Sequence, residues 1–406
     1  MRVAIFSKSF PVISETFIIN QITGLIDLGV DISILTNEIK NENVMHSSVK
    51  EYALMDHVIS LCNYSGNSKF KKLLISILNF FRLIKNRKIM DVISILLDKY
   101  LSLGQKINLF SAILNLNRDV VEYKNIVCHF GDNAYYVYKM RSLGLFSGPI
   151  SVVFHGYEMS RYDIVNKNLP QYKQVFKLCE IFLPISQLWK DKLIEWGCDP
   201  LKIKVHRMGI NVDDFKIINI NKKFSSPLNI IQVGRLTEKK SILNSVKAII
   251  IAKKEVNLVF TIIGDGDDYV EVENLIRQNK AENYIKLLGS QPQTIVKDYL
   301  QFADIFLLPS VRASDGDMEG VPVALMEAMA SGLIVLSTYH SGIPELINNY
   351  ESGFLVKEGS VDDLAKGIVK ISNLSQRKIV AIRKNARNVC IKKFNNKILN
   401  ENLYRL

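Results

Sequence analysis

The sequence predicts an α/β protein with two doubly wound, Rossmann-like domains that face each other across a cleft. The first observation is that short, continuous apolar runs alternate with longer amphipathic segments, as in parallel strands that helices cover on both faces. The second is the length of 406 residues, which suits two domains of ordinary size. The third is a polar, basic stretch over 219–227 that ends in proline and separates two series of such runs.

Each series supplies the strands of one predicted sheet. The predicted strands of the first are Val3–Phe6, Ile32–Leu35, Ile126–His129, Ser151–Phe154 and Ile181–Pro184. Those of the second are Ile230–Val233, Val259–Ile263, Ile305–Leu308 and Ile334–Ser337. We place the N-terminal domain at 1–213, a linker at 214–228, the C-terminal domain at 229–385 and, at 386–406, a C-terminal helix that could cross back to the N-terminal domain. Ligands of open parallel sheets bind beyond the carboxyl ends of the strands, so we expect the site in the cleft.

Composition restricts the partners and the compartment. The 52 Lys and Arg residues exceed the 40 Asp and Glu residues and give a net charge of +12, which favours anionic partners. Charge placement favours phosphates and a membrane surface, and we expect no nucleic-acid partner. Five scattered cysteines without a Cys-x-x-Cys pair predict free thiols in a reducing cytoplasm. No signal sequence and no apolar run of about 18–20 residues occurs, so we expect a cytoplasmic protein that could attach peripherally to the inner membrane face.

A helical insert over about 67–117 interrupts the first series of strands. Between Lys69 and Lys88 it carries seven basic residues and no acidic one. Its apolar residues fall at helical spacing, at Leu73, Ile77, Phe81 and Ile84. One interpretation is a basic amphipathic helix that lies on an anionic membrane. The other is a helix that packs its apolar side on the core and exposes its basic residues to solvent.

The most informative chemistry lies in a loop and helix of the second half. An acidic loop over 314–320 precedes a predicted helix that begins near Gly320 and Val321 and ends at Gly332. Free backbone N–H groups at such a helix start form an anion site that suits a diphosphate. Glu319 and Glu327 lie eight residues apart, at most about 12 Å along a helix. Carboxylates at that spacing can accept hydrogen bonds from the hydroxyls of a sugar and a ribose.

The stretch D-G-D-M-E-G-V-P-V-A-L-M-E-A-M-A-S-G over 315–332, followed by S-T-Y-H-S-G-I-P-E-L-I over 337–347, resembles the family 4 glycosyltransferases. It is similar in particular to bacterial exopolysaccharide enzymes of the colanic-acid and amylovoran type. The resemblance implies a GT-B fold, an acceptor-binding N-terminal domain and a C-terminal domain that binds a nucleotide-sugar. It also implies retention of anomeric configuration, with Glu319 at the donor sugar and Glu327 at the ribose.

Two further segments of the second half resemble the same family. V-G-R-L-T-E-K-K over 233–240 is similar to the family's G-R-L-x-x-K-K-G loop, although Ser241 replaces the usual last glycine. The resemblance implies that Arg235 and Lys240 hold the diphosphate and neutralise the leaving group, with Gly234 beside them. Gly264, in G-D-G-D over 264–267, is implied to form part of the donor wall.

Three segments of the first half also match. F-H-G-Y-E over 154–158 resembles the family's H-G-x-D/E turn and implies that His155 lies at the reaction centre. H-F-G-D-N-A over 129–134 matches another family motif, so we expect His129 to line the cleft. F-P-V-I-S-E-T-F over 10–17 resembles the opening segment of the subfamily and implies that Ser14, Glu15 and Thr16 contact the acceptor.

The triplet Asp315-Gly316-Asp317 has the form of a metal-binding D-x-D motif. Its place in the family's own loop favours a different role, and the positive charges of Arg235 and Lys240 can compensate the leaving diphosphate. We therefore expect no metal and no other cofactor.

The predicted function is retaining transfer of a hexose from a nucleotide-sugar, UDP-linked in preference to GDP-linked, to an oligosaccharide acceptor carried on a lipid, in bacterial surface polysaccharide biosynthesis. One alternative is a nucleotide-sugar epimerase or a phosphorylase of the same fold. Another is a catalytically inactive scaffold in a polysaccharide assembly complex. The complete set of Arg235, Lys240, Glu319 and Glu327 argues against the scaffold. A nicotinamide dehydrogenase is disfavoured because no G-x-G-x-x-G follows an early strand.

Overall fold

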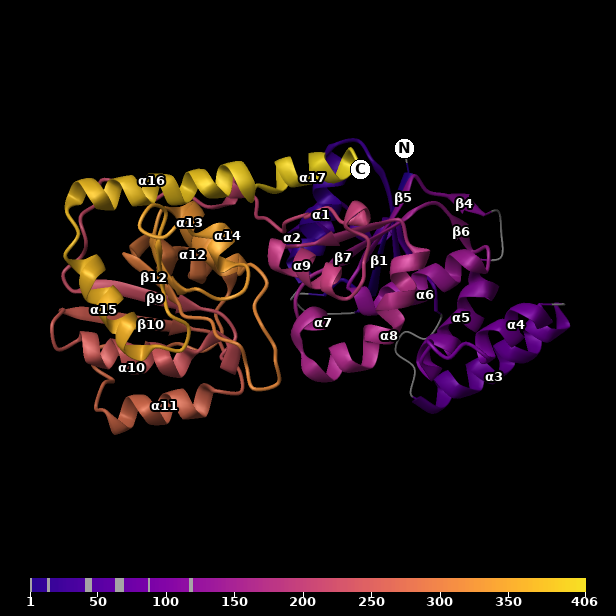
Figure 1. Cartoon of the computed structure of the whole chain (residues 1–406), viewed down its shortest axis with the longest axis horizontal. Helices are drawn as coiled ribbons and strands as arrows, with labels where there is room; N and C mark the ends of the chain where they lie inside the picture. The colour runs from indigo at the N-terminus through magenta and orange to yellow at the C-terminus, as the bar shows by residue number, and fades with distance from the viewer. Residues whose placement is uncertain (1, 13–14, 41–45, 63–68, 87, 117–119) are drawn as a thin grey trace.

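The computed structural model describes residues 2–12, 15–40, 46–62, 69–86, 88–116 and 120–406, with the backbone alone over 69–73. It contains two parallel six-stranded sheets, one in each half of the chain (Figure 1). Both sheets carry helices on their faces, so the predicted pair of doubly wound domains is confirmed. All nine predicted strands are present, and each lies within a strand of the structure.

The first sheet has the order β3-β2-β1-β5-β7-β8. These strands are β1 (Arg2–Phe10), β2 (Asp31–Ile39), β3 (Val58–Ser60), β5 (Asn125–His129), β7 (Ile150–Phe154) and β8 (Ile181–Pro184). In register, Ile5 lies beside Ile34 on one side and Val127 on the other, and Ile5 and Ile34 are completely buried. The covering helices are α1 (Thr16–Asp27), α2 (Ser47–Glu51), α6 (Gly131–Ser142), α7 (Tyr157–Ser160), α8 (Tyr162–Leu178) and α9 (Gln187–Glu195). A small pair, β4 (Val121–Glu122) and β6 (Phe146–Ser147), lies beside it.

The second sheet has the order β11-β10-β9-β12-β13-β14. These strands are β9 (Leu228–Val233), β10 (Leu258–Ile263), β11 (Ile285–Leu287), β12 (Ile305–Leu308), β13 (Ile334–Thr338) and β14 (Phe354–Val356). Its helices are α10 (Ile242–Ala252), α11 (Tyr269–Gln278), α12 (Gln293–Phe302), α13 (Val323–Ser331), α14 (Ile343–Leu346) and α15 (Val361–Ser372). All four residues of β12 are completely buried, which explains why this strand reads as a continuous apolar run.

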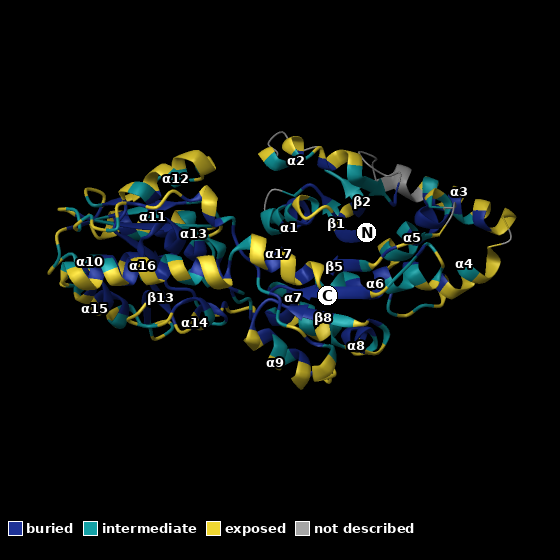
Figure 2. Ribbon diagram, turned by 90° about the horizontal axis from the view of Figure 1, so that it is seen from above, coloured by how far each residue is buried: buried dark blue, intermediate teal, exposed yellow. Residues whose placement is uncertain are grey.

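The insert is helical, as predicted, in its described residues. It contains α3 (Lys69–Lys85), α4 (Ile89–Leu96) and α5 (Leu103–Asn115). The side chain of Ser102 accepts a hydrogen bond from the backbone N–H of Gln105, and the Gln105 side chain bonds back to Ser102. This capping box fixes the start of α5. Figure 2 shows α3 and α4 at the end of the first half that is remote from the second sheet.

The C-terminal segment forms two helices, whereas the sequence predicted one over 386–406. α16 (Gln376–Lys393) begins earlier than predicted, and α17 (Asn396–Tyr404) follows it. The break occurs at Asn395, whose side chain caps α17 by accepting from Lys397 N and whose backbone bridges Ile210. α16 packs on α13 and α17 packs on α1, so the chain returns from the second half to the first (Figure 1).

Candidate active site

A buried ion pair between Lys240 and Glu319 lies at the centre of the predicted donor site. Lys240 ends a short 3-10 helix (Glu238–Lys240) in the loop that follows β9, and Glu319 precedes α13. Lys240 Nζ is 3.0 Å from Glu319 Oε1, and the side chains are 14% and 10% exposed. Burial alone would raise the pKa of Glu319, but Lys240 and Lys239 outweigh burial, so its pKa lies below the usual value. Glu319 is therefore ionised at neutral pH.

The glycines that follow β9 and β10 bring two loops together beside Lys240. Gly234 and Gly264 both have a φ of 148°. A Cβ on Gly264 would lie 1.9 Å from the carbonyl oxygen of Gly234, whereas Lys240 Cε lies 3.6 Å from a Cβ built on Gly234. A side chain at Gly264 would therefore separate the two loops. The structure thus brings Gly234, Gly264 and Lys240 together, and their role on the donor side stays a prediction.

The backbone of Glu319 is held by a histidine that sequence reasoning did not single out. Glu319 N donates to His340 Nε2 at 3.2 Å, and His340 Nδ1 lies 2.9 Å from Glu358 Oε2. Because Nε2 accepts, Nδ1 carries the hydrogen and donates to Glu358. His340 lies within the S-T-Y-H-S-G stretch, so its position in the motif was the available signal.

Gly320 and Val321 lie before α13, not in its first turn. The helix begins at Val323, with Pro322 as an extended N-cap residue, because the backbone turns into the helix only after the proline. Gly320 lies against the first half of the chain. A Cβ on it would lie 2.6 Å from Ile185 Cδ1 and 3.1 Å from the carbonyl oxygen of His155. The loop that carries Glu319 therefore contacts the end of β7.

His155 ends a chain of buried polar side chains in the first half. Its Nε2 lies 3.1 Å from His129 Nδ1. His129 Nε2 lies 2.9 Å from Gln21 Oε1, and Gln21 Nε2 lies 3.3 Å from His206 Nε2. His129 is completely buried and stacks on His155, which differs from the predicted place in the cleft wall. His129 therefore contacts His155 through a hydrogen bond and ring stacking and does not face the cleft. No motif indicated Gln21 or His206.

The direction of each hydrogen bond in this chain follows from Gln21. Its amide nitrogen can only donate, so His206 Nε2 accepts, and its oxygen can only accept, so His129 Nε2 carries a hydrogen. His129 Nδ1 then accepts from His155 Nε2. Burial lowers the pKa of His129 to about 3 and that of His206 to about 4, and it lowers the pKa of His155 well below the usual value. All three rings are therefore neutral at pH 7, and Nδ1 of His155 is left as an acceptor.

Glu158 holds the backbone of the His155 turn. Its Oε1 accepts from His155 N at 2.7 Å and its Oε2 from Gly156 N at 3.0 Å. Burial raises the pKa of Glu158 to about 7, against the lowering effect of these two hydrogen bonds. Glu158 is the last residue of the F-H-G-Y-E motif, and its structural role explains why an acid at this position belongs to the motif.

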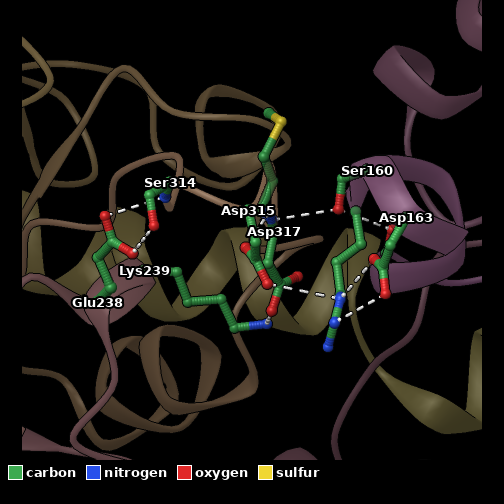
Figure 3. A network of polar contacts seen from close by, with 10 residues as sticks. Ser160, Asp163, Glu238, Lys239, Ser314, Asp315 and Asp317 are labelled. Carbon is green, nitrogen blue, oxygen red and sulfur yellow. Dashed lines mark hydrogen bonds and ion pairs between the residues drawn. The ribbon is translucent and has the colours of Figure 1, made fainter. Parts of the chain in front are cut away.

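The acidic loop before Glu319 is attached to the rest of the second half through the loop after β9 (Figure 3). Lys239 Nζ lies 2.9 Å from Asp317 Oδ2. Glu238 accepts from Ser314 N at 2.9 Å and from Ser314 Oγ at 2.7 Å. Glu238 and Lys239 therefore hold the acidic loop in place, and Lys240 contacts the end of the same loop through its ion pair with Glu319.

The same loop also contacts the first half of the chain. Arg161 lies 3.5 Å from Asp315, Tyr162 N donates to the carbonyl oxygen of Asp315 at 3.0 Å, and Met318 N donates to Ser160 Oγ at 3.2 Å (Figure 3). Both acids of the D-x-D triplet thus face cations of the protein itself. Among the described residues, we find no group of three or more His, Cys, Asp or Glu side chains arranged to hold a metal ion.

Glu327 and Thr16 line a cavity of about 590 Å³ between the two halves. Thr16 begins α1 and Glu327 lies on α13. Burial raises the pKa of Glu327 to about 7, while Lys297 acts in the opposite direction. This cavity is large enough for a nucleoside or a sugar ring. It contains hydrogen-bonding groups from both halves, including Asn20, Asn211 and Lys297.

The remaining predicted residues lie apart from these contacts. Arg235 is exposed, and its side chain forms no hydrogen bond or ion pair with the described residues. Burial raises the pKa of Glu15, which accepts from Ser7 Oγ at 3.4 Å. Ser14 lies outside the described residues.

Comparisons with known proteins decide the family. The model for glycosyl transferases group 1 matches residues 213–389. Amylovoran biosynthesis glycosyltransferase AmsK of Erwinia amylovora is 38% identical over 376 residues, which cover 92% of this chain and 91% of the relative. The chain belongs to the group 1 glycosyltransferases. This glycosyltransferase is also 35% identical to the putative colanic acid biosynthesis glycosyltransferase WcaL of Escherichia coli over 407 aligned residues, which cover 100% and 99% of the two chains.

Solved structures show the fold of this group 1 glycosyltransferase. Anabaena Alr3699/HepE in complex with UDP and glucose matches with a TM-score of 0.72 and 17% identity, over 100% of this chain and 98% of the other. Sucrose-phosphate synthase from Thermosynechococcus elongatus matches with a TM-score of 0.71 and 15% identity, over 100% and 98%. These matches confirm the GT-B fold that the motifs implied.

Proposed function

We propose that this glycosyltransferase transfers a hexose, with retention of configuration, from a UDP-sugar to a lipid-linked oligosaccharide in exopolysaccharide biosynthesis. The observation that carries the proposal is the buried Lys240–Glu319 pair, at 3.0 Å, on a loop that contacts the end of β7 at His155. This arrangement provides positive charge for a leaving diphosphate and a carboxylate beside it, next to a histidine from the opposite half.

In the proposed reaction, the bond between the anomeric carbon and the diphosphate breaks while the acceptor hydroxyl attacks from the same face. Lys240 and the exposed Arg235 stabilise the negative charge that develops on the diphosphate. The leaving phosphate oxygen takes the proton of the acceptor hydroxyl. Glu319 orients the donor sugar, and Glu327 accepts hydrogen bonds from the ribose. No metal is needed, because the two cations supply the compensating charge.

Neutral His155 suits a hydrogen-bonding role toward the sugar. Because its Nε2 hydrogen is used toward His129, the ring offers Nδ1 as an acceptor. A hydroxyl of the donor hexose is a suitable partner for such an acceptor. The low pKa of His155, which burial causes, keeps the ring neutral beside the charged donor.

The names of related proteins support the substrate classes. AmsK and WcaL are named for amylovoran and colanic acid biosynthesis. An Escherichia coli enzyme named UDP-Gal:alpha-D-GlcNAc-diphosphoundecaprenol alpha-1,3-galactosyltransferase is 28% identical over 247 residues, which cover 55% of this chain and 60% of that enzyme. Its named donor is a UDP-sugar and its named acceptor a sugar on a lipid diphosphate.

The test is donor turnover with a panel of UDP- and GDP-sugars, with and without a polyprenyl-diphosphate sugar acceptor and with and without EDTA. We expect acceptor-dependent transfer from a UDP-sugar, an unchanged rate in EDTA and an axial product linkage from an axial donor by NMR. Arg235→Ala and Glu319→Gln should each reduce kcat/KM at least 100-fold. Lys286→Ala, an exposed cation on β11, is the matched control. Conversion of the donor without acceptor would indicate an epimerase instead, and normal turnover in both variants would refute the assigned site.

A further inference from the structure

Helix α3 presents one row of apolar residues to the outside, while Leu83 is buried and Ile75 and Phe80 pack on the core. Four residues of this row repeat at intervals of three or four residues and are exposed, so they share one face: Leu74, Ile77, Leu78 and Phe81. Phe81 is 62% exposed. The buried positions include two polar residues, Ser76 and Asn79, and Asn79 Nδ2 donates to Ser111 Oγ at 3.4 Å. The interpretation in which this face packs on the core is therefore wrong, because the helix contacts α5 through its other side, where Phe80 packs on Phe110.

Helix α4 exposes a second row of the same kind. Its members are Ile89, Met90, Ile93 and Leu96, with Leu97 directly after the helix. Met90 is 73% exposed and Leu97 79%, while Val92 and Ile95 are buried. We call these two rows, together with Ile84, the insert face. The two helices are in contact and lie at the outer end of the first half (Figures 1 and 2). Exposed large apolar side chains gathered on two helices that contact each other indicate an interaction site.

The charge around the insert face selects the partner. Lys69 to Lys88 contains seven basic residues and no acidic one. Arg82 and Lys85 are exposed and form no ion pair with the described residues. The acids that follow are already paired, since Asp91 lies 3.5 Å from Lys88 and Asp98 lies 3.1 Å from Lys139. The insert face therefore presents apolar side chains bordered by uncompensated positive charge.

A second copy of this chain is a poor partner for such a surface, because a symmetric contact would place like charges against each other. An anionic bilayer satisfies both features, since its head groups attract Lys and Arg and its acyl region accepts Leu, Ile, Met and Phe. No described helix is both long and apolar enough to span a membrane. Contact with the bilayer through the insert face then leaves the helices at the surface of the membrane.

We propose that α3 and α4 dock this glycosyltransferase on an anionic phospholipid bilayer, with the insert face in the boundary between head groups and acyl chains. The biological purpose of docking rests on the proposed function, because docking would keep the enzyme at the membrane surface where a lipid-linked acceptor is held. The structural argument for docking itself needs only the insert face and its charge.

The experiment is co-sedimentation of the full chain with vesicles of phosphatidylcholine alone and with 30 mol% phosphatidylglycerol. We expect binding only to the anionic vesicles, weakened at high salt. Leu78→Asp/Met90→Asp and, separately, Arg82→Glu/Lys85→Glu should each weaken partitioning at least tenfold. Leu201→Asp, at an apolar residue that is 91% exposed and remote from the insert, is the matched control. Both pairs of positions are exposed, so folding should be preserved, and circular dichroism checks this.

Two outcomes would overturn the inference. One is equal binding of the variants and the native chain. The other is a native dimer in analytical ultracentrifugation that Leu78→Asp/Met90→Asp converts to monomer without any vesicle binding. Transfer to a short-chain, water-soluble acceptor separates this question from the proposed function. Leu78→Asp/Met90→Asp and Arg82→Glu/Lys85→Glu should retain full activity with that water-soluble acceptor. If the native chain itself shows no transfer to it, the result counts against the proposed function and not against docking.

Discussion

Replacing Lys240 by methionine tests whether the buried pair with Glu319 supports both stability and catalysis. At the observed 3.0 Å, the Coulomb attraction is about 5–6 kcal/mol for an effective dielectric constant of about 20. Removing one partner of such a pair leaves a buried charge and costs about 3–5 kcal/mol. We expect a loss of about 3 kcal/mol, because Glu319 can lower the cost by taking a proton. Glu319→Gln/Lys240→Met should recover part of it, with a coupling of about 2 kcal/mol in a double-mutant cycle.

The native chain and Lys240→Met should differ in the direction in which folding stability changes with pH. In the native chain the pKa of Glu319 lies below its usual value, so its stabilising contribution is present above the unfolded pKa of about 4.3 and is lost as pH falls through the folded pKa. Without Lys240, burial dominates and raises the pKa of Glu319 in the folded chain. Stability then falls as pH rises above about 4.3.

The assay is chemical unfolding of the four proteins of the cycle at pH 4, 5, 6 and 7, together with kcat/KM. Loss of the cation should reduce kcat/KM about 100- to 1,000-fold, the range for removal of one group that stabilises transition-state charge. Additive losses of stability in the cycle, or an unchanged pH slope in Lys240→Met, would refute the reasoning. Lys286→Met is the matched control for loss of an exposed lysine.

Three further predictions concern the first half and its contact with the second. Glu158→Gln should destabilise the protein by about 1–3 kcal/mol and lower kcat, because the two N–H groups of the His155 turn donate to different carboxylate oxygens, and the amide replaces one of these by a donor. Normal kcat would exclude this role. The native chain should lose stability between pH 7 and pH 5, because His206 takes a proton in the unfolded chain but not in the folded one, where its pKa is about 4. His206→Gln should reduce this loss, measured by urea unfolding, by up to about 2 kcal/mol. An unchanged loss would contradict a neutral His206 ring. Arg161→Ala should change stability by less than about 1 kcal/mol, because the ion pair of Arg161 with Asp315 is half-exposed. It should raise KM for the donor, because Arg161 holds the acidic loop before Glu319. An unchanged KM would show that Arg161 does not position this loop.

Much of the fold could be predicted because its strands are buried on both faces. Ile305–Leu308 and Ile334–Ser337 read as continuous apolar runs, and the structure has them as neighbours in one sheet. The edge strands β3, β11 and β14 were missed, because three residues are too short for a pattern. Those of β3 are also only partly buried. The break at Asn395 was also missed, since its cause is a bridge to Ile210 that no local pattern shows.

The candidate site divides in the same way. Lys240 and Glu319 could be identified because each lies in a motif, and the structure places their side chains in contact. Gln21 could not, because it is one polar residue on the buried side of α1 and acquires its role only from two histidines that are distant in sequence. The orientation of α3 was likewise undetermined. Apolar spacing predicts that one face is distinct, but not whether that face meets the core or the outside.

The return of α17 onto α1 has a consequence for biosynthesis. During translation, the first half emerges before the second. In the finished chain, α1 contacts α17, and the side chain of Asn400 donates to the carbonyl oxygen of Asn20. This surface of α1 stays uncovered until the ribosome has made all of the second sheet. The N-terminal half therefore cannot reach its final packing on its own. A nascent chain stalled before residue 396 should expose this surface to chaperones and proteases, and completing the last helix should close it.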